Sequence, residues 1–169
     1  YLFQGINLIQ SAKNKKKYFK DLPPTKYLKF FKKNYDKIDI NYIKKYFEKS
    51  KFYDNLILYI SLTNDDFSKS EFNFSVNFST KQIKFQIVDK INLKDSNKNR
   101  VLYLKCRKES FLNTIYNKAP WEDLSIGFQC KILRFPNMYN LKFWYHFTNE
   151  YTSKKNIRFS SNCGKCEKL

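Results

Sequence analysis

The sequence is poor in residue types that several common functions require. Its 169 residues contain 3 glycines, 4 prolines and 1 histidine. Because three glycines are too few for a glycine-rich phosphate-binding loop, we expect no nucleotide site of that kind. With His146 as its only histidine, the chain offers no Ser-His-Asp set and no histidine-rich metal centre. No run of 18 apolar residues occurs, so we expect no membrane span, and a binding protein is favoured over an enzyme.

Acidic residues are also scarce, which leaves the chain strongly basic. It carries 33 Lys and Arg residues against 15 Asp and Glu, a formal net charge of +18 at pH 7. A genome rich in A and T accounts for part of the lysine but not for the shortage of acids. Such a charge predicts anionic partners as a class, such as an anionic polymer or an acidic lipid surface. Only four arginines are present, and since arginine makes most bidentate base contacts, sequence-specific reading is disfavoured.

Lysine is concentrated in residues 13–51, where two helices are predicted. The structural interpretation is a solvated lysine face on helices that pack into the core, and the functional one is a phosphate-binding face. Both interpretations stay open, with the structural one favoured. Under the functional interpretation the anion-binding residues are Lys15, Lys16, Lys17, Lys29, Lys32, Lys33, Lys44 and Lys45.

The four cysteines fall into two groups. Cys106 and Cys130 lie in apolar runs and are expected to be reduced core thiols, which indicates a cytoplasmic protein. Cys163 and Cys166 form a CxxC pair, which is half of a zinc site. Three interpretations of this pair stay open: an unconstrained tail, a half-site completed by sequence beyond Leu169, or ligands donated across an oligomer. We expect no cofactor, with zinc at Cys163 and Cys166 as the alternative.

Aromatic residues make up 19% of the chain, which is ample material for a packed core. Residues 1–5 resemble an imperfect protease-cleavage remnant and are left out of the fold expectations. A short helix is predicted over 25–31, directly after two consecutive prolines. A second helix is predicted over 40–50, because apolar and aromatic side chains recur at helical spacing at Tyr42, Ile43, Tyr46 and Phe47.

The middle of the chain changes to the spacing of β-strands. Residues 56–62 form a continuous apolar run, and apolar side chains then alternate with polar ones over 72–78 and 83–87. A fourth strand is predicted over 101–106. Because the connections between these strands are short, we expect an antiparallel meander.

The last third of the chain is predicted to be largely helical. Ser110 is expected to cap a helix, and Pro120 to open a short turn over 121–124. A fifth strand follows over 128–133, and a final helix over 139–151 precedes a basic tail. That helix is expected to present one broad face made of Leu141, Trp144, Tyr145 and Thr148.

These segments together predict an α+β fold, with a five-stranded, mostly antiparallel sheet covered by helices on one face. A basic helical N-terminal extension over 6–51 would precede the α+β domain at 52–151, and the basic tail would occupy 152–169. The side chains expected to line the core or an apolar ligand site are Phe72, Phe74, Phe78, Phe85, Trp121, Phe128 and Trp144.

One stretch carries a family resemblance. Residues 104–147 contain six features in this order: a strand, a helix, an acidic turn at 121–124, Gly127, a second strand and a last helix. This order is similar to the second half of a sterol-carrier-protein-like domain. The runs 120–128 and 134–144 further resemble C-terminal regions appended to metallo-β-lactamase-fold hydrolases, including relatives of Rieske-type sialic-acid hydroxylases. The histidine cluster and the Rieske Cys/His set of those proteins have no counterpart in this sequence.

The resemblance implies a non-catalytic appendage, in which sheet and helices enclose an apolar tunnel that phenylalanine rings either line or fill. The first function hypothesis is therefore an accessory module that contacts a larger protein partner or binds an apolar, acyl or sterol-like ligand. The second hypothesis is a lysine-rich nucleic-acid-binding protein. The third is a fragment of a metal-dependent enzyme.

Overall fold

The computed structural model describes residues 35, 37–80, 82–89, 91 and 99–154. The expectations for residues 1–5, for the helix over 25–31 and for the Cys163–Cys166 pair lie outside the described residues.

The described residues contain a single sheet of five strands in the order β3-β2-β1-β4-β5. Its strands are β1 (Leu56–Thr63), β2 (Ser70–Asn77), β3 (Lys84–Ile87), β4 (Arg100–Arg107) and β5 (Cys130–Phe135). Neighbouring strands are antiparallel except β1 and β4, which run parallel. The predicted α+β fold with a mostly antiparallel sheet is therefore confirmed. The predicted antiparallel meander is wrong for the fourth strand, β4, which pairs with β1 in parallel. The connection over residues 88–99 is long enough for the chain to cross the sheet and pair β4 with β1.

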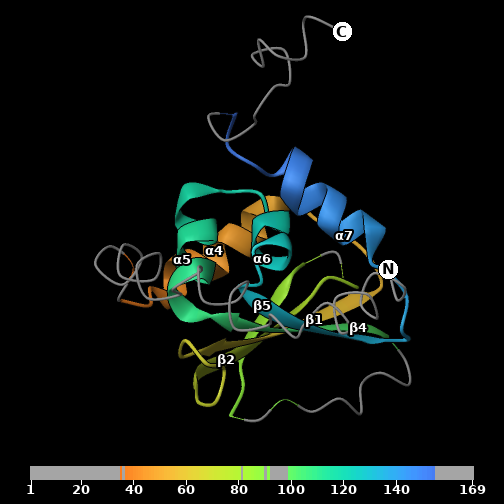
Figure 1. Cartoon of the computed structure of the whole chain (residues 1–169). Coiled ribbons are helices and arrows are strands. Elements are labelled where there is room, and N and C mark those ends of the chain that lie inside the picture. Colours follow the sequence, from red (N-terminus) through yellow and green to blue (C-terminus); the bar gives the residue numbers. More distant parts are fainter. Residues whose placement is uncertain (1–34, 36, 81, 90, 92–98, 155–169) are drawn as a thin grey trace, which may run out of the picture.

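Helices cover one face of this sheet. The helices are α4 (Ile40–Ser50), α5 (Lys108–Asn117), α6 (Glu122–Ile126) and α7 (Leu141–Tyr145), and α7 continues into a π-helical turn, η3 (His146–Glu150). Figure 1 shows α4, α5, α6 and α7 gathered on the same side of the strands. The core therefore lies between one layer of helices and one layer of sheet, as is usual for an α+β domain.

The helix α4 has the bounds expected from its spacing and belongs to the domain core. The side chain of Asp39 caps it by accepting a hydrogen bond from the backbone N–H of Tyr42, at 2.9 Å. Its apolar stripe, Ile43, Tyr46 and Phe47, is at most 3% exposed and packs in the same cluster as the sheet. The expected domain boundary after residue 51 therefore falls within one continuous core.

Aromatic rings fill the space between the sheet and the helices. The ring of Phe47 lies between 5.9 and 6.1 Å, centroid to centroid, from those of Phe74, Phe78, Trp121 and Phe147. All five side chains have 0% exposure. As the alternation over 72–78 predicted, the phenylalanines of β2 point toward the helices. Edge-on and tilted ring pairs of this kind each add about 0.5–1.5 kcal/mol beyond the burial of their apolar area.

One hydrogen bond is buried among these rings. The indole Nε1–H of Trp121 donates to the hydroxyl of Tyr46, at 2.8 Å, and the two rings lie 6.5 Å apart and nearly parallel. Burial raises the pKa of Tyr46 well above its usual range, so its hydroxyl stays neutral. The bond links α4 to the residue that precedes α6.

The other face of the sheet carries a smaller apolar cluster of Ile57, Tyr59 and Val101. Tyr103 and Phe135 pack against this cluster and extend it over β4 and β5. The sheet thus buries apolar side chains on both faces of β1, which explains why residues 56–62 read as a continuous apolar run.

Two helix details differ from expectation. The helix α5 begins at Lys108, so Ser110 lies in its first turn instead of capping it, and its hydroxyl donates to Gln129 Oε1 at 3.0 Å. The final helix changes to π geometry at His146, where Tyr151 N–H donates to the carbonyl of His146 at 2.7 Å. Phe143, Trp144 and Phe147 are buried, whereas Leu141 and Tyr145 of the expected face are exposed.

The Tyr46–Trp121 bond leads to a stability prediction. Replacing Tyr46→Phe leaves the buried indole N–H without an acceptor, which we expect to lower the free energy of unfolding by about 1–3 kcal/mol. Urea unfolding followed by circular dichroism measures this. The matched control is Tyr53→Phe, because Tyr53 is 65% exposed and its hydroxyl reaches solvent; we expect a change below about 0.5 kcal/mol. Equal effects of the two substitutions would contradict the role of the buried bond.

Candidate functional site

The structure separates the seven side chains predicted to line a core or ligand site. Phe74, Phe78, Trp121 and Trp144 are at most 1% exposed, and Phe72 and Phe85 are partly buried against the same cluster. Phe128 instead lies on the surface and is 82% exposed. Its expected inward position is therefore wrong, because the fifth strand begins at Cys130 and residues 127–129 form a turn.

The turn holds Phe128 in a conformation that is unusual for a large side chain. Its φ angle is 54°, in the left-handed region that favours glycine. The preceding Gly127 has an ordinary φ, but a Cβ there would lie 2.6 Å from the carbonyl oxygen of Asp123. Backbone hydrogen bonds from Phe128 to Ser125 and from Gln129 to Leu124, at 3.2 and 2.8 Å, close the turn. The result is an exposed ring on a constrained backbone.

Arg107, at the end of β4, fixes this turn to the loop after β1. Its Nη1 donates to the carbonyl of Phe128 and to Gln129 Oε1, each at 3.1 Å, and its Nε donates to the carbonyl of Asp65 at 2.7 Å. Its guanidinium also lies 4.7 Å from the ring centroid of Phe67.

Phe67 is a second residue with a left-handed backbone, at φ 65°. The Lys131 ammonium lies 5.0 Å from its ring centroid. Ile126, 71% exposed, precedes the Phe128 turn in the chain. We call the residues Phe67, Arg107, Ile126, Phe128 and Lys131 the aromatic–arginine surface. Strained backbone of this kind tends to occur at functional sites.

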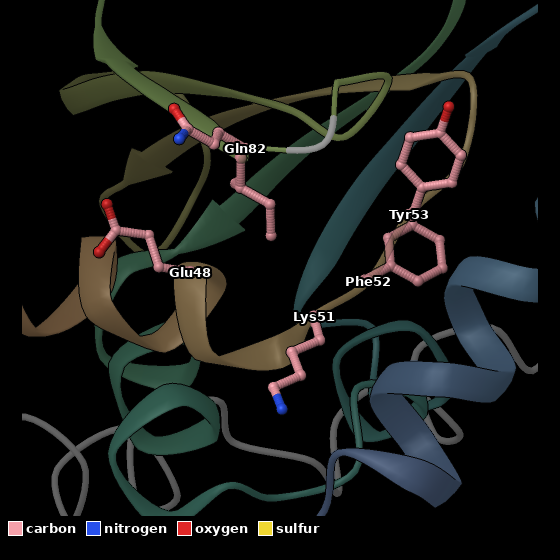
Figure 2. A pocket seen from close by; sticks show the side chains of 6 residues that line it. Glu48, Lys51, Phe52, Tyr53 and Gln82 are labelled. Carbon is pink, nitrogen blue, oxygen red and sulfur yellow. The ribbon is translucent and has the colours of Figure 1, made fainter.

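Two hollows lie at the opposite end of β1, beside the connection from α4. The larger has a volume of about 460 Å³, and Figure 2 shows Glu48, Lys51, Phe52, Tyr53 and Gln82 around it. The second, of about 390 Å³, shares the three connecting residues and is completed by side chains of α7 and η3. Both are open to the surface and have mixed polar and apolar walls, so neither is the enclosed apolar tunnel that the resemblance suggested.

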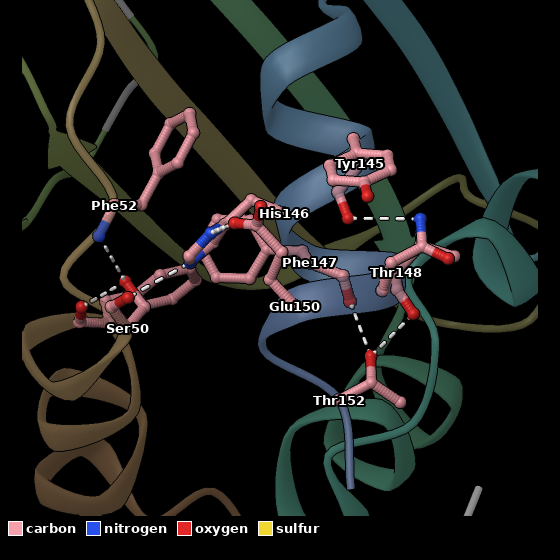
Figure 3. A network of polar contacts seen from close by, with 10 residues as sticks. Ser50, Phe52, Tyr145, His146, Phe147, Thr148, Glu150 and Thr152 are labelled. Carbon is pink, nitrogen blue, oxygen red and sulfur yellow. Dashed lines mark hydrogen bonds and ion pairs between the residues drawn. The ribbon is translucent and has the colours of Figure 1, made fainter. Parts of the chain in front are cut away.

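His146 has a structural role at the edge of the second hollow. Its Nε2 lies 3.0 Å from the carbonyl oxygen of Ser50, and its Nδ1 lies 2.6 Å from Glu150 Oε2 (Figure 3). The Ser50 carbonyl and the Glu150 carboxylate are both acceptors, so each can receive a hydrogen bond from a ring N–H of His146. The ring also stacks on Tyr151 with centroids 6.0 Å apart. These contacts connect the end of α4 to η3.

The other predicted site residues are only partly covered by the structure. Lys44 and Lys45 are exposed on α4, and Lys44 lies 3.9 Å from Glu48 of the next turn. The remaining six lysines of the anion-binding prediction, and Cys163 and Cys166, lie outside the described residues. Among the residues that are described, no group of three or more His, Cys, Asp or Glu side chains is placed to hold a metal ion. In the same part of the chain, no helix is long and apolar enough to cross a membrane.

The fold defines an α+β domain with helices on one face of a five-stranded mixed sheet. No family model matches the chain. It is 30% identical, over 98 residues, to the cytidine monophosphate-N-acetylneuraminic acid hydroxylase of Danio rerio. The match covers 57% of this chain but 15% of the hydroxylase, so the chain spans a small part of that relative.

A solved structure is also similar to this chain. It is the crystal structure of sterol carrier protein-2 like-3 from Aedes aegypti, with a TM-score of 0.47 and 12% sequence identity. The similarity covers 63% of this chain and 91% of that one. Both resemblances expected from the sequence, to a sialic-acid hydroxylase and to a sterol carrier protein, are thus found by comparison.

Sequence reasoning missed Phe67 and Arg107. Nothing in the sequence indicated that the arginine at the end of the fourth strand would join the loop after the first strand to the turn at 127–129. Tertiary pairing of β1 with β4 places Thr63 opposite Arg107 and so brings the loops together.

The His146 contacts lead to a second stability prediction. We expect His146→Ala to lower the free energy of unfolding by about 1–3 kcal/mol, because the half-buried ring loses its packing and its bond to Ser50. Glu150→Gln is the control: the carboxylate is 56% exposed, so its loss should cost less than about 0.5 kcal/mol. Chemical unfolding of the two variants measures the difference, and a neutral His146→Ala would refute the structural role.

Proposed function

We propose that this domain is a non-catalytic accessory module that contacts a larger protein partner through the aromatic–arginine surface. The observation that carries the proposal is Phe128, a large apolar ring that is 82% exposed on a left-handed backbone. Folding alone gives no reason to keep an aromatic residue there, since glycine adopts that backbone at lower cost. Contact with a protein partner accounts for an exposed aromatic ring at this position.

The surroundings of Phe128 suit a protein contact. Aromatic residues and arginine are enriched at the positions that contribute most to protein interfaces. Arg107 holds the Phe128 carbonyl and the Asp65 carbonyl in place before any partner arrives. Such preorganisation lowers the entropy lost on binding. Ile126 adds a second exposed apolar side chain next to the turn.

The comparison with the hydroxylase supports a role within a larger assembly. There, the matched stretch makes up 15% of a much longer polypeptide. By analogy, the surface of this domain would contact other domains of a longer polypeptide or a separate protein.

An apolar ligand is the second candidate, favoured by the hollow beside Phe52, Tyr53 and Ile83. Its volume of about 460 Å³ lies within the range of small-ligand sites. Because the interior is filled with rings, such a ligand would bind at this surface hollow. Titration with a fluorescent fatty acid tests the idea: we expect Tyr53→Ala to weaken binding at least about tenfold, whereas Ile87→Ala on β3 leaves it unchanged. Absence of saturable binding would remove this candidate.

The strain at Phe128 predicts that stability and binding respond in opposite directions. We expect Phe128→Gly to raise the free energy of unfolding by about 0.5–1 kcal/mol, because glycine relieves the left-handed backbone and no buried contact is lost. Denaturant titration measures this change. A loss of more than about 1 kcal/mol would show that the ring supports the fold and would contradict a binding role.

The partner contact itself is tested with a photo-reactive phenylalanine analogue at position 128. In an extract of the native source, we expect cross-links to one discrete protein, competed away by unlabelled wild-type domain but not by the Phe128→Gly domain. Ile87, 56% exposed on the far edge strand, is the matched control position. Cross-linking at position 128 no stronger than at position 87 would overturn the proposal.

A further inference from the structure

The cysteines of the sheet face one another across two strands. Cys106 of β4 and Cys130 of β5 are direct partners in the antiparallel register. Both are free thiols; Cys106 is buried and Cys130 is partly exposed. Both contribute to the packing on the helix-covered face of the sheet. The aromatic–arginine surface does not use either thiol.

The pairing of β4 with β5 brings these two side chains close together. The next pair along the strands, Arg107 and Gln129, is joined by a backbone hydrogen bond of 3.0 Å from the Arg107 N–H. Because hydrogen-bonded and non-hydrogen-bonded pairs alternate in an antiparallel ladder, Cys106 and Cys130 form a non-hydrogen-bonded pair. In such pairs the Cα atoms are about 4.5 Å apart, which lies within the range of roughly 4.4–6.8 Å that a disulfide spans. A bridge therefore needs little backbone movement.

The surroundings of the two thiols shift their pKa values in opposite directions. The pKa of Cys130 lies below its ordinary value because of a hydrogen bond from the Cys106 thiol, and the positive charge of Arg134 acts in the same direction. Burial raises the pKa of Cys106, which therefore stays a neutral thiol. The partly exposed Cys130 is thus the thiol that loses its proton more readily and reacts first, and the enclosed Cys106 reacts second.

We propose that Cys106 and Cys130 form a reversible disulfide when the protein meets a hydroperoxide. The Cys130 thiolate attacks the terminal peroxide oxygen, the O–O bond breaks, and the leaving alkoxide or hydroxide takes up a proton. The Cys106 sulfur then attacks the resulting sulfenic acid and forms the S–S bond. Its proton leaves with the hydroxyl group as water. Two thiols lose two electrons in total, and the peroxide gains them; an external thiol reverses the reaction by exchange.

The bridge would tie the edge strand β5 to β4 directly beside the turn that carries Phe128. Gln129, which accepts from Arg107 and from Ser110, lies between Phe128 and Cys130. The disulfide would therefore form next to the aromatic–arginine surface. The proposal for the disulfide does not rest on the function proposed for that surface.

The experiment uses the full chain with Cys163→Ser and Cys166→Ser, so that the two sheet cysteines are the only thiols. One molar equivalent of hydrogen peroxide should lower the intact mass by two hydrogen atoms and remove both thiols from alkylation after unfolding. Dithiothreitol should restore them. Since closing the loop constrains the unfolded chain, we expect Tm to rise by an amount on the order of 5 °C.

Single substitutions in this background distinguish the roles of the two thiols. With Cys106→Ser, oxidation should stop at a sulfenic acid that dimedone traps. With Cys130→Ser, the buried thiol should react at least about tenfold more slowly. A gain of oxygen atoms at Cys130 while Cys106 remains open to alkylation would overturn the proposal.

Should a serine variant fail to fold, the unsubstituted chain provides the same test by peptide mapping. The expected product is a peptide pair linked through Cys106 and Cys130. Recovery of Cys106 as an alkylated thiol after peroxide treatment would refute the disulfide, whatever happens at Cys163 and Cys166.

Discussion

The buried hydrogen bond between Trp121 and Tyr46, set among stacked rings, is the interaction on which the described domain depends. A polar pair removed from water must find its partner within the protein, so it fixes α4 relative to the start of α6. The surrounding rings then pack in one arrangement around Phe47. Among the described residues these rings form the core between sheet and helices, and the candidate binding features described above lie on the surface.

The two hollows and the aromatic–arginine surface lie at opposite ends of the sheet, and different contacts form them. The hollows beside Tyr53 are open to the surface and have mixed polar and apolar walls, whereas the aromatic–arginine surface is held by charged hydrogen bonds to backbone carbonyls. Arg107 joins two loops, each with a left-handed phenylalanine, and so holds Phe67 and Phe128 in strained conformations. Local strain persists where neighbouring contacts over-determine the backbone, and this arginine supplies those contacts.

Much of the fold was predictable because it follows from local spacing. Helix α4, the strands β1 to β4 and the inward alternation of Phe74 and Phe78 all reflect periodicities of 3.6 or 2 residues. The final helix was predicted in place, and Trp144 of its expected face is buried, but Leu141 and Tyr145 are exposed because the side that packs on the core is formed by Phe143, Trp144 and Phe147. The exposure of Phe128 was missed because Phe128, Cys130 and Ile132 alternate with polar residues, so that Phe128 resembles the first inward residue of a strand.

The sequence by itself determined the elements and their apolar faces, because these depend on residues within a few positions of one another. It also determined the strong positive charge and the absence of a histidine-rich centre. Only the tertiary structure decided that β4 pairs with β1, that Cys106 faces Cys130, and that Arg107 joins the Phe67 and Phe128 loops. Each of these contacts joins residues more than 20 positions apart, and their pairing is set by packing of the whole core, which no local pattern encodes.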